Sequence, residues 1–114
     1  MKYPQFEQAA ADLEVSVETY LQMVRLFLDD TRSQLEALES AVKKMDADGA
    51  DRIAHHIAGA AENLEFNDFG RAARELRTDL TSFGPGDPRT QESVQAIHHE
   101  FQRAEKQVNL KESN

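Results

Sequence analysis

The sequence lacks several residue types and segments on which common protein chemistries depend. It contains no cysteine, which excludes disulfide bonds, thiolate zinc sites and cysteine nucleophiles together. No apolar run approaches the roughly 18 residues of a membrane-crossing helix, and residues 1–7 lack the apolar core of a signal peptide. Internal repeats, low-complexity tracts and linkers are also missing. We therefore expect a single domain over residues 1–114 and a cytoplasmic location.

Positive charge is scarce relative to negative charge. The chain carries 13 lysine and arginine residues against 21 aspartate and glutamate residues, for a formal net charge of -8. Because phosphate backbones and anionic membranes attract basic surfaces, this balance argues against nucleic acid and membrane partners. An excess of carboxylates is typical of a solvated surface whose charges repel one another.

Apolar residues recur at helical spacing along the chain, and no alternating strand pattern competes with them. They predict a short leading helix over about 3–13 and longer helices over about 17–45, 48–65, 67–83 and 88–110. The expected N-caps are Ser16, Asp48, Asn67 or Asp68, and Asp87. Four such apolar stripes are buried most simply in an all-α, antiparallel up-and-down four-helix bundle over about 17–110, with the leading helix as a short extra N-terminal element.

The central predicted helix turns one side toward the core and presents a histidine on the other. At ~100° of rotation per residue, the predicted core side comprises Ala50, Ile53, Ile57, Ala60, Ala61 and Leu64. His55 lies nearly opposite the middle of this arc and should face water. His56 lies at the edge of the apolar stripe and should be partly packed. His55 is therefore preferred over His56 as a reactive residue.

The histidines do not form a metal-site pattern. Two ligands on one helix face stand three or four residues apart, yet Gly59 and Ala60 follow His55 and His56 at that spacing. The second histidine pair, residues 98–99, is followed there by glutamine and arginine. Calcium loops, hydrolytic triads and phosphate-cradling loops are not present in full either. We expect no metal site and no cofactor on this chain.

His55 remains as the candidate for chemistry. A solvent-facing neutral imidazole has a nitrogen lone pair that can attack a phosphoryl group. Gly59, one helical turn further on, removes the side chain that would otherwise crowd an incoming partner. A surface histidine near a glycine also has an ordinary structural explanation, so these two residues alone leave both interpretations open.

A longer stretch around this histidine resembles the signature of the histidine-containing phosphotransfer (HPt) domain family. That signature runs Ala-His, any residue, an aliphatic residue, Lys or Arg, Gly, then small residues, a polar residue, Leu and Gly. The matching residues are Ala54, His55, Ile57, Gly59, Ala60, Ala61 and Leu64. The resemblance extends over roughly residues 17–110 and implies a four-helix bundle.

The resemblance implies a phosphoryl carrier without a nucleotide site of its own. Domains of this family carry a phosphoryl group on an exposed histidine between the aspartates of receiver domains, so His55 would be the phosphoacceptor. The implied partners are receiver domains of response regulators or hybrid histidine kinases. The receiver would contribute the aspartate and a bound magnesium ion, while this chain offers only a positioned nucleophile. We expect the chain to be a monomer.

Two positions depart from the family pattern. Ala58 replaces the basic residue three places after the histidine, and Glu65 replaces the second glycine. In the family, a lysine at the first position would lie near the phosphoryl oxygens. Its absence leaves two functions open: a working phosphorelay intermediate, or an HPt-like module that docks on a receiver or kinase without accepting phosphate.

The expected phosphate- and partner-binding surface around the acceptor comprises Asp51, Arg52, Gly59 and Glu62. Asp51 and Glu62 should leave this face acidic, which would disfavour a phosphoryl group by about 1 kcal/mol before screening. Arg52, three residues before the histidine, could offset part of that repulsion.

Overall fold

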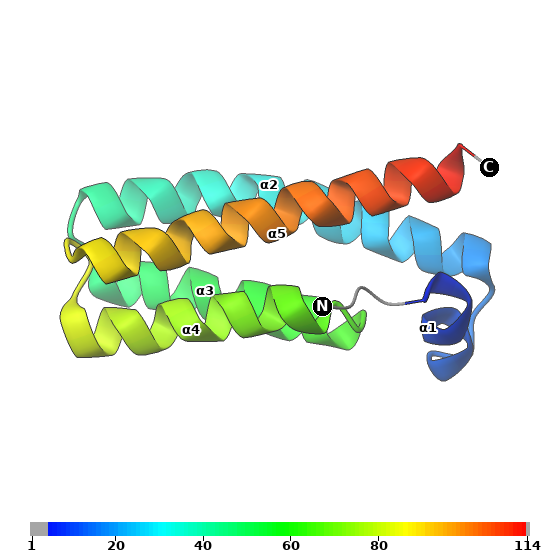
Figure 1. The fold of residues 1–114 in the computed structure, drawn as a ribbon, viewed down its shortest axis with the longest axis horizontal. Coiled ribbons are helices and arrows are strands. Elements are labelled where there is room, and N and C mark those ends of the chain that lie inside the picture. The colour runs from blue at the N-terminus through cyan, green and yellow to red at the C-terminus, as the bar shows by residue number, and fades with distance from the viewer. Residues whose placement is uncertain (1–4, 114) are drawn as a thin grey trace.

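The structure, a computed structural model, describes residues 5–113. Those residues form five helices and no strand: α1 (Phe6–Asp12), α2 (Val17–Lys43), α3 (Ala47–Asn63), α4 (Asn67–Phe83) and α5 (Pro88–Glu112). The prediction of an all-helical chain is confirmed. Figure 1 shows the four longer helices side by side along the 42 Å dimension of the molecule, with α1 beside the start of α2.

The four longer helices surround one core. α2 packs against α3 and α5, and α4 packs against the same two helices, with the most extensive contact between α3 and α4. Within residues 5–113, the pairs α2–α4 and α3–α5 make no close backbone contact. The contacts therefore close into a ring, and the apolar stripes of all four helices meet inside it.

An aromatic cluster joins α1 to the four-helix arrangement formed by α2 to α5. The Phe6 ring lies 5.5 Å from the Tyr20 ring and 6.4 Å from the Phe66 ring, and Phe27 stacks on Phe66 at 6.2 Å. Burial raises the pKa of the Tyr20 hydroxyl, which donates a hydrogen bond of 2.6 Å to the carbonyl of Leu64. The leading helix was expected over 3–13, and residues 3 and 4 lie outside the described part of the chain.

The helix starts follow the expected chemistry at two of four predicted caps. Ser16 accepts a hydrogen bond from the Thr19 amide, and Asp87 accepts one from the Arg89 amide. The predicted cap at Asp48 is wrong. The side chain of Asp46 accepts a hydrogen bond from the Gly49 amide at 2.9 Å, and α3 begins directly after Asp46, at Ala47. The cap expected at Asn67 or Asp68 is also wrong, because α4 begins at Asn67 and its N-cap is Phe66, which makes no side-chain cap bond. At the other end of the chain, α5 continues to Glu112, two residues beyond the expected limit.

Three helices end with a non-glycine residue in the left-handed region. Glu14, Met45 and Glu65 have φ angles of 60°, 59° and 68° and directly follow the C-caps of α1, α2 and α3. Glycine is favoured at this position because the left-handed conformation costs a residue with a side chain about 1 kcal/mol. Glu65 therefore occupies the site of the family's second glycine with the backbone conformation that glycine would adopt. The same turn removes Met45 from α2 and leaves it 62 % exposed.

The buried side of α3 is rotated relative to the prediction. Ala54 and Ala58 are fully buried beside Ile57, whereas Ile53 and Ala60 are only half-buried. The buried arc is displaced by roughly 50°, about half of one residue step. This displacement moves the apolar edge away from His56, and it places residue 58 among the core positions of α3.

Candidate functional site

His55 lies on the exposed surface of α3, as predicted, and next to α4. The prediction for His56 is wrong: its side chain is 55 % exposed rather than packed against the core. The rotated core arc explains the error, because both histidines now lie well outside it. Exposure alone therefore does not distinguish the two residues, and their hydrogen-bond partners must do so.

Arg77 of α4 is the closest polar neighbour of His55. Its Nη1 lies 2.9 Å from Nδ1 of His55. The same guanidinium binds Asp51, one helical turn before the histidine, through Nε at 2.9 Å from Oδ1 and Nη2 at 3.4 Å from Oδ2. A continuous chain of polar contacts thus runs from Asp51 through Arg77 to the imidazole across the α3–α4 interface.

The two neighbouring histidines are engaged through different nitrogens. Nε2 of His56 lies 2.9 Å from a carboxylate oxygen of Asp30 on α2. His55 itself is exposed; it is engaged through Nδ1, and its Nε2 has no hydrogen-bond partner among residues 5–113. His55 thus combines one anchored nitrogen with one that has no partner among these residues, whereas Nε2 of His56 lies against a carboxylate.

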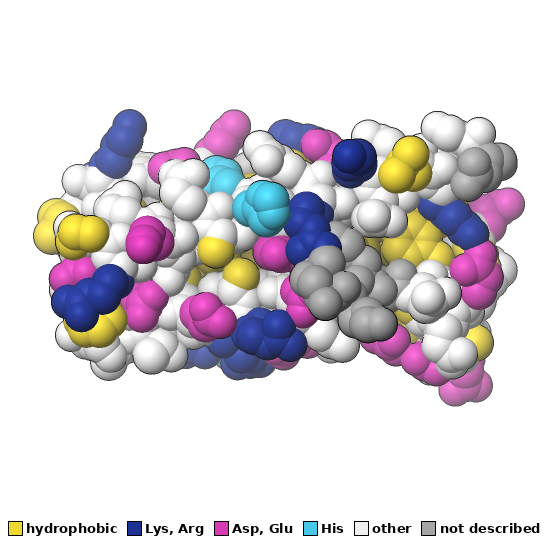
Figure 2. Space-filling model, viewed as in Figure 1, with side chains coloured by type: hydrophobic (Ala, Val, Ile, Leu, Met, Phe, Trp, Pro, Cys, Tyr) yellow, Lys and Arg dark blue, Asp and Glu magenta, His cyan; other side chains and the backbone are white. Residues whose placement is uncertain are grey.

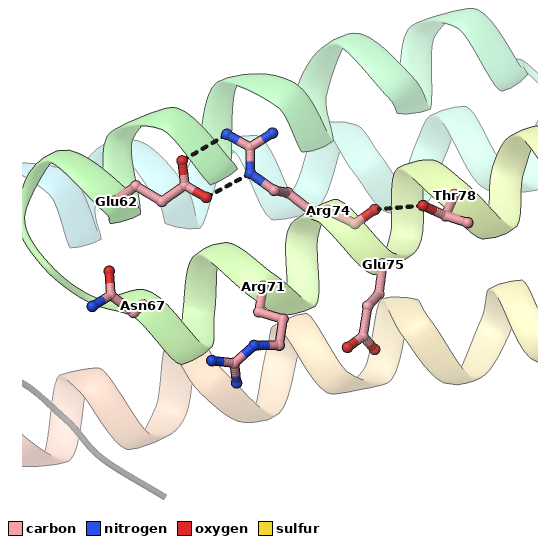
Figure 3. Close-up of a pocket in the computed structure, with 6 residues that line it drawn as sticks. All are labelled: Glu62, Asn67, Arg71, Arg74, Glu75 and Thr78. Carbon is pink, nitrogen blue, oxygen red and sulfur yellow. Dashed lines mark hydrogen bonds and ion pairs between the residues drawn. The ribbon is translucent and has the colours of Figure 1, made fainter.

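A second arginine of α4 pairs with the other carboxylate of the expected surface. Arg74 approaches Glu62 with Nε and Nη2 at 2.5 and 2.6 Å from its two oxygens, and Figure 3 shows these side chains directed toward each other. The hydrogen bonds from Arg74 lower the pKa of the Glu62 carboxyl, and Glu62 raises the pKa of Arg74 in turn. Gly70 leaves the necessary space, since a Cβ there would lie 2.7 Å from Cγ of Glu62.

These pairs change the electrostatics expected from the sequence. Asp51 and Glu62 were predicted to leave the face around His55 acidic, but each carboxylate lies against an arginine of α4. The repulsion of a phosphoryl group is therefore offset from the neighbouring helix. Position 58, three residues after the histidine, is fully buried. A long cationic side chain at this position could not reach the surface around His55 without disturbing the core.

The remaining predicted surface residues lie at different places. Arg52 lines a groove between α2 and α3 that also contains His56 and Lys44, so it is not part of the Asp51–Arg77 chain. Gly59 is half-buried on α3, and a Cβ on it would meet nothing within 4 Å. Packing among the described residues 5–113 therefore does not require a glycine at position 59.

The α4 arginines are the site residues that the sequence analysis missed. Arg71, Arg74 and Arg77 recur every three residues, which places them along one stretch of the helix surface. This periodicity was visible in the sequence, but no local pattern shows which helix α4 will face. Only the α3–α4 contact brings Arg77 to His55, 22 residues away in the chain.

Residues 5–113 contain neither a cluster of potential metal ligands nor a helix suited to cross a membrane. No group of three or more histidine, cysteine or carboxylate side chains in that range could hold a metal ion. None of its helices combines the length and the apolar composition that a membrane crossing requires.

Comparison with known protein families gives a match over most of the chain. The family model described as Hpt domain matches residues 22–107, well over half of the 114-residue chain, and that range includes α3, α4 and every residue of the His55 surface. No curated protein and no solved structure matches this sequence.

Proposed function

Because the chain belongs to the Hpt domain family, whose members are phosphoryl carriers with a relay role, we propose that His55 is its phosphoacceptor. In this proposal His55 receives a phosphoryl group from the aspartate of one receiver domain and passes it to the aspartate of another. The observation that carries the proposal is an exposed histidine that is anchored to the neighbouring helix through Nδ1, while its Nε2 has no partner among residues 5–113.

The proposed reaction needs only a nucleophile from this chain. Nε2 of His55 attacks phosphorus, a nitrogen–phosphorus bond forms, and the bond from phosphorus to the aspartate oxygen breaks with its electron pair on the carboxylate. The reverse steps discharge the carrier onto a second aspartate. The receiver would hold the magnesium ion, so the carrier requires no cofactor. Holding the histidine on a rigid helix positions it for this attack.

The proposed docking surface surrounds Nε2 of His55. It comprises Asp51, Arg52, Gly59 and Glu62, with the α4 arginines 74 and 77 at its border. Gly59 supports this assignment, because a helical glycine costs about 1 kcal/mol relative to alanine and no contact among residues 5–113 requires it. A partner that approaches α3 closely would account for its presence.

We also infer an antiparallel up-and-down order for the bundle, with a single domain that acts as a monomer. Consecutive helices contact each other in the ring and are joined by the short segments 44–46, 64–66 and 84–87. Such connections favour antiparallel neighbours. α1 then serves as the short extra helix beside one end.

Transfer from a panel of phosphorylated receiver domains tests the proposal. We expect acid-labile, alkali-stable label on the wild-type protein and on His56→Gln, and none on His55→Gln. Equal labelling of His55→Gln would contradict His55 as the acceptor. Absence of label from every receiver, together with retained binding that is indifferent to His55→Ala, would identify a docking module that does not accept phosphate.

A further inference from the structure

The hydrogen bond between Arg77 and His55 has only one possible direction. A guanidinium carries five N–H donors and no acceptor. Nδ1 of His55, 2.9 Å from Nη1 of Arg77, must therefore accept the hydrogen bond with its lone pair. A neutral imidazole with an unprotonated Nδ1 carries its proton on Nε2.

Asp51 keeps the guanidinium in the position that makes this bond. Its carboxylate binds the Nε side of Arg77, which leaves Nη1 directed at His55. The Arg77 and Asp51 side chains are 34 % and 39 % exposed, so the pair lies at the edge of the interface rather than free in solvent. Two contacts from different atoms fix the guanidinium better than either would alone.

We propose that Arg77 is a positioning residue that holds His55 in the Nε2–H tautomer, and that phosphoryl transfer to Nε2 begins only when Arg77 leaves Nδ1. The inference rests on the proposed role of His55 as acceptor. In the free protein, the nitrogen that faces a partner is protonated and has no lone pair to offer. The reactive tautomer carries its proton on Nδ1. In that tautomer the N–H of Nδ1 and the N–H of Arg77 Nη1 would be two donors facing each other with no acceptor between them.

Release of Arg77 resolves this conflict without any further reactant. The proton leaves Nε2 for solvent and solvent supplies one to Nδ1, so the ring remains neutral. Nε2 then attacks phosphorus while the aspartate carboxylate departs with the electron pair of the broken bond. An incoming phosphoryl group offers oxygen acceptors that can replace Nδ1 as the partner of Nη1. Arg77 would thus be released by the arrival of the group that His55 accepts.

Nitrogen-15 NMR of the unphosphorylated protein tests the tautomer directly, at a pH where the ring is neutral. The wild type should show His55 with an unprotonated Nδ1 and a protonated Nε2. Arg77→Gln provides an amide oxygen that can accept from Nδ1–H and should shift the population toward the Nδ1–H tautomer. Arg74→Gln is the matched control, since it removes one positive charge from the same helix without a contact to His55. A wild-type Nδ1–H tautomer, or equal populations in all three proteins, would overturn the inference.

Phosphorylation by phosphoramidate tests the consequence without a receiver domain. In this reaction Nε2 displaces ammonia from phosphorus. We expect Arg77→Gln to label His55 about tenfold faster than Arg74→Gln, which corresponds to about 1.4 kcal/mol. A slower rate in Arg77→Gln would contradict the gating role and show that the arginine assists the phosphoryl group. If none of the proteins is labelled, the proposed acceptor role fails, and the NMR populations still decide the tautomer.

Discussion

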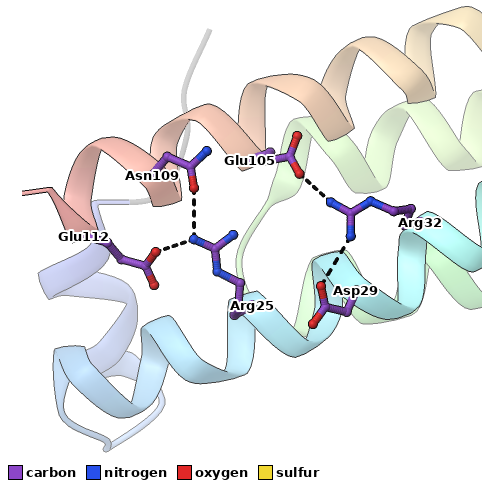
Figure 4. A network of polar contacts seen from close by, with 6 residues as sticks. All are labelled: Arg25, Asp29, Arg32, Glu105, Asn109 and Glu112. Carbon is purple, nitrogen blue, oxygen red and sulfur yellow. Dashed lines mark hydrogen bonds and ion pairs between the residues drawn. The ribbon is translucent and has the colours of Figure 1, made fainter.

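Two helix pairs of this bundle carry a histidine and arginine–carboxylate contacts, yet they differ in what the histidine can do. On the α3–α4 surface, one arginine is shared between a carboxylate and His55. On the α2–α5 surface, the arginines bind carboxylates and an amide: Arg32 contacts Asp29 and Glu105, and Arg25 contacts Asn109 and Glu112 (Figure 4). The histidine of that surface, His98, instead approaches the carboxylate of Glu39 at 2.8 Å.

The difference shows that a histidine pair in the sequence does not define a site. His98 is 29 % exposed, its Nε2 is buried, and it lines a groove with Leu35, Phe101 and Gln102. His55 is exposed and has Gly59 where His98 has Gln102, four residues on. Figure 2, in the same view as Figure 1, shows histidine side chains among acidic and basic groups on the face along which α5 runs. Access to a nitrogen, rather than residue type, distinguishes the two surfaces.

Removing each histidine in turn should produce the largest contrast. His55→Gln deletes the proposed nucleophile and should reduce phosphoryl uptake from a receiver domain below detection. His98→Gln should leave the rate within about twofold of the wild type, because the α2–α5 surface supplies no reacting atom. Initial rates of transfer from the same receiver measure both. A comparable loss in the two variants would show that the two surfaces do not differ in function.

Replacing Gly59 by glutamine, the residue that follows His98 at the same spacing, should reduce the difference between the α3–α4 and α2–α5 surfaces. Gly59→Gln places a long side chain one turn from His55 and should slow receiver-dependent transfer about tenfold by obstructing the partner. Gly59→Ala is the matched control and should transfer nearly as well as the wild type. Both variants should be more stable by about 0.5–1 kcal/mol, because a helical glycine is replaced and a Cβ meets nothing within 4 Å.

Thermal or urea denaturation beside the transfer assay separates these effects. Slower transfer in a more stable Gly59→Gln protein would locate the defect at the partner surface rather than in the fold. Unchanged transfer would mean that the glycine does not serve an approaching partner, and it would remove position 59 from the proposed surface.

The helices and the acceptor candidate were predictable from local patterns. The buried stripe of α5, comprising Val94, Ile97, Phe101, Ala104 and Val108, follows the helical period over the whole element. The caps at Ser16 and Asp87 are likewise set by neighbouring residues. The exposure of His55 was predictable because it depends only on its own helix, and the choice of His55 as candidate acceptor rested on the resemblance of residues 54–64 to the family signature. Each of these features is determined within a few turns of chain.

The features that the sequence did not predict depend on how helices meet. The α3 core arc includes Ala54 and Ala58, and α3 makes its most extensive contact with α4, which helical period alone does not reveal. For the same reason the basic partner of His55 appears on α4 and not at position 58. The tautomer of His55 follows from this contact between residues 22 positions apart, so no motif around the histidine could have indicated it.

The smallest expected effect concerns the ion pairs that both surfaces share. Glu62→Gln removes the carboxylate bound by Arg74 and should lower the free energy of unfolding by about 0.5 kcal/mol at pH 7, since the pair is partly solvated. The folded-state pKa of Glu62 is lowered from 4.5. Its contribution is therefore fully present above about pH 4.5 and is lost as the pH falls through the lowered value.

Urea denaturation at pH 7 and at pH 3 measures that difference, with Glu105→Gln as the control on the α2–α5 surface, where the same kind of pair joins Arg32. Similar small losses at pH 7 would show that the ion pairs of the two surfaces are equivalent in stability, so that the surfaces differ in the histidine and not in their salt bridges. A loss for Glu62→Gln that persists unchanged at pH 3 would contradict the Arg74 pairing as its cause, because a group whose folded pKa is lowered from 4.5 must contribute less at pH 3 than at pH 7.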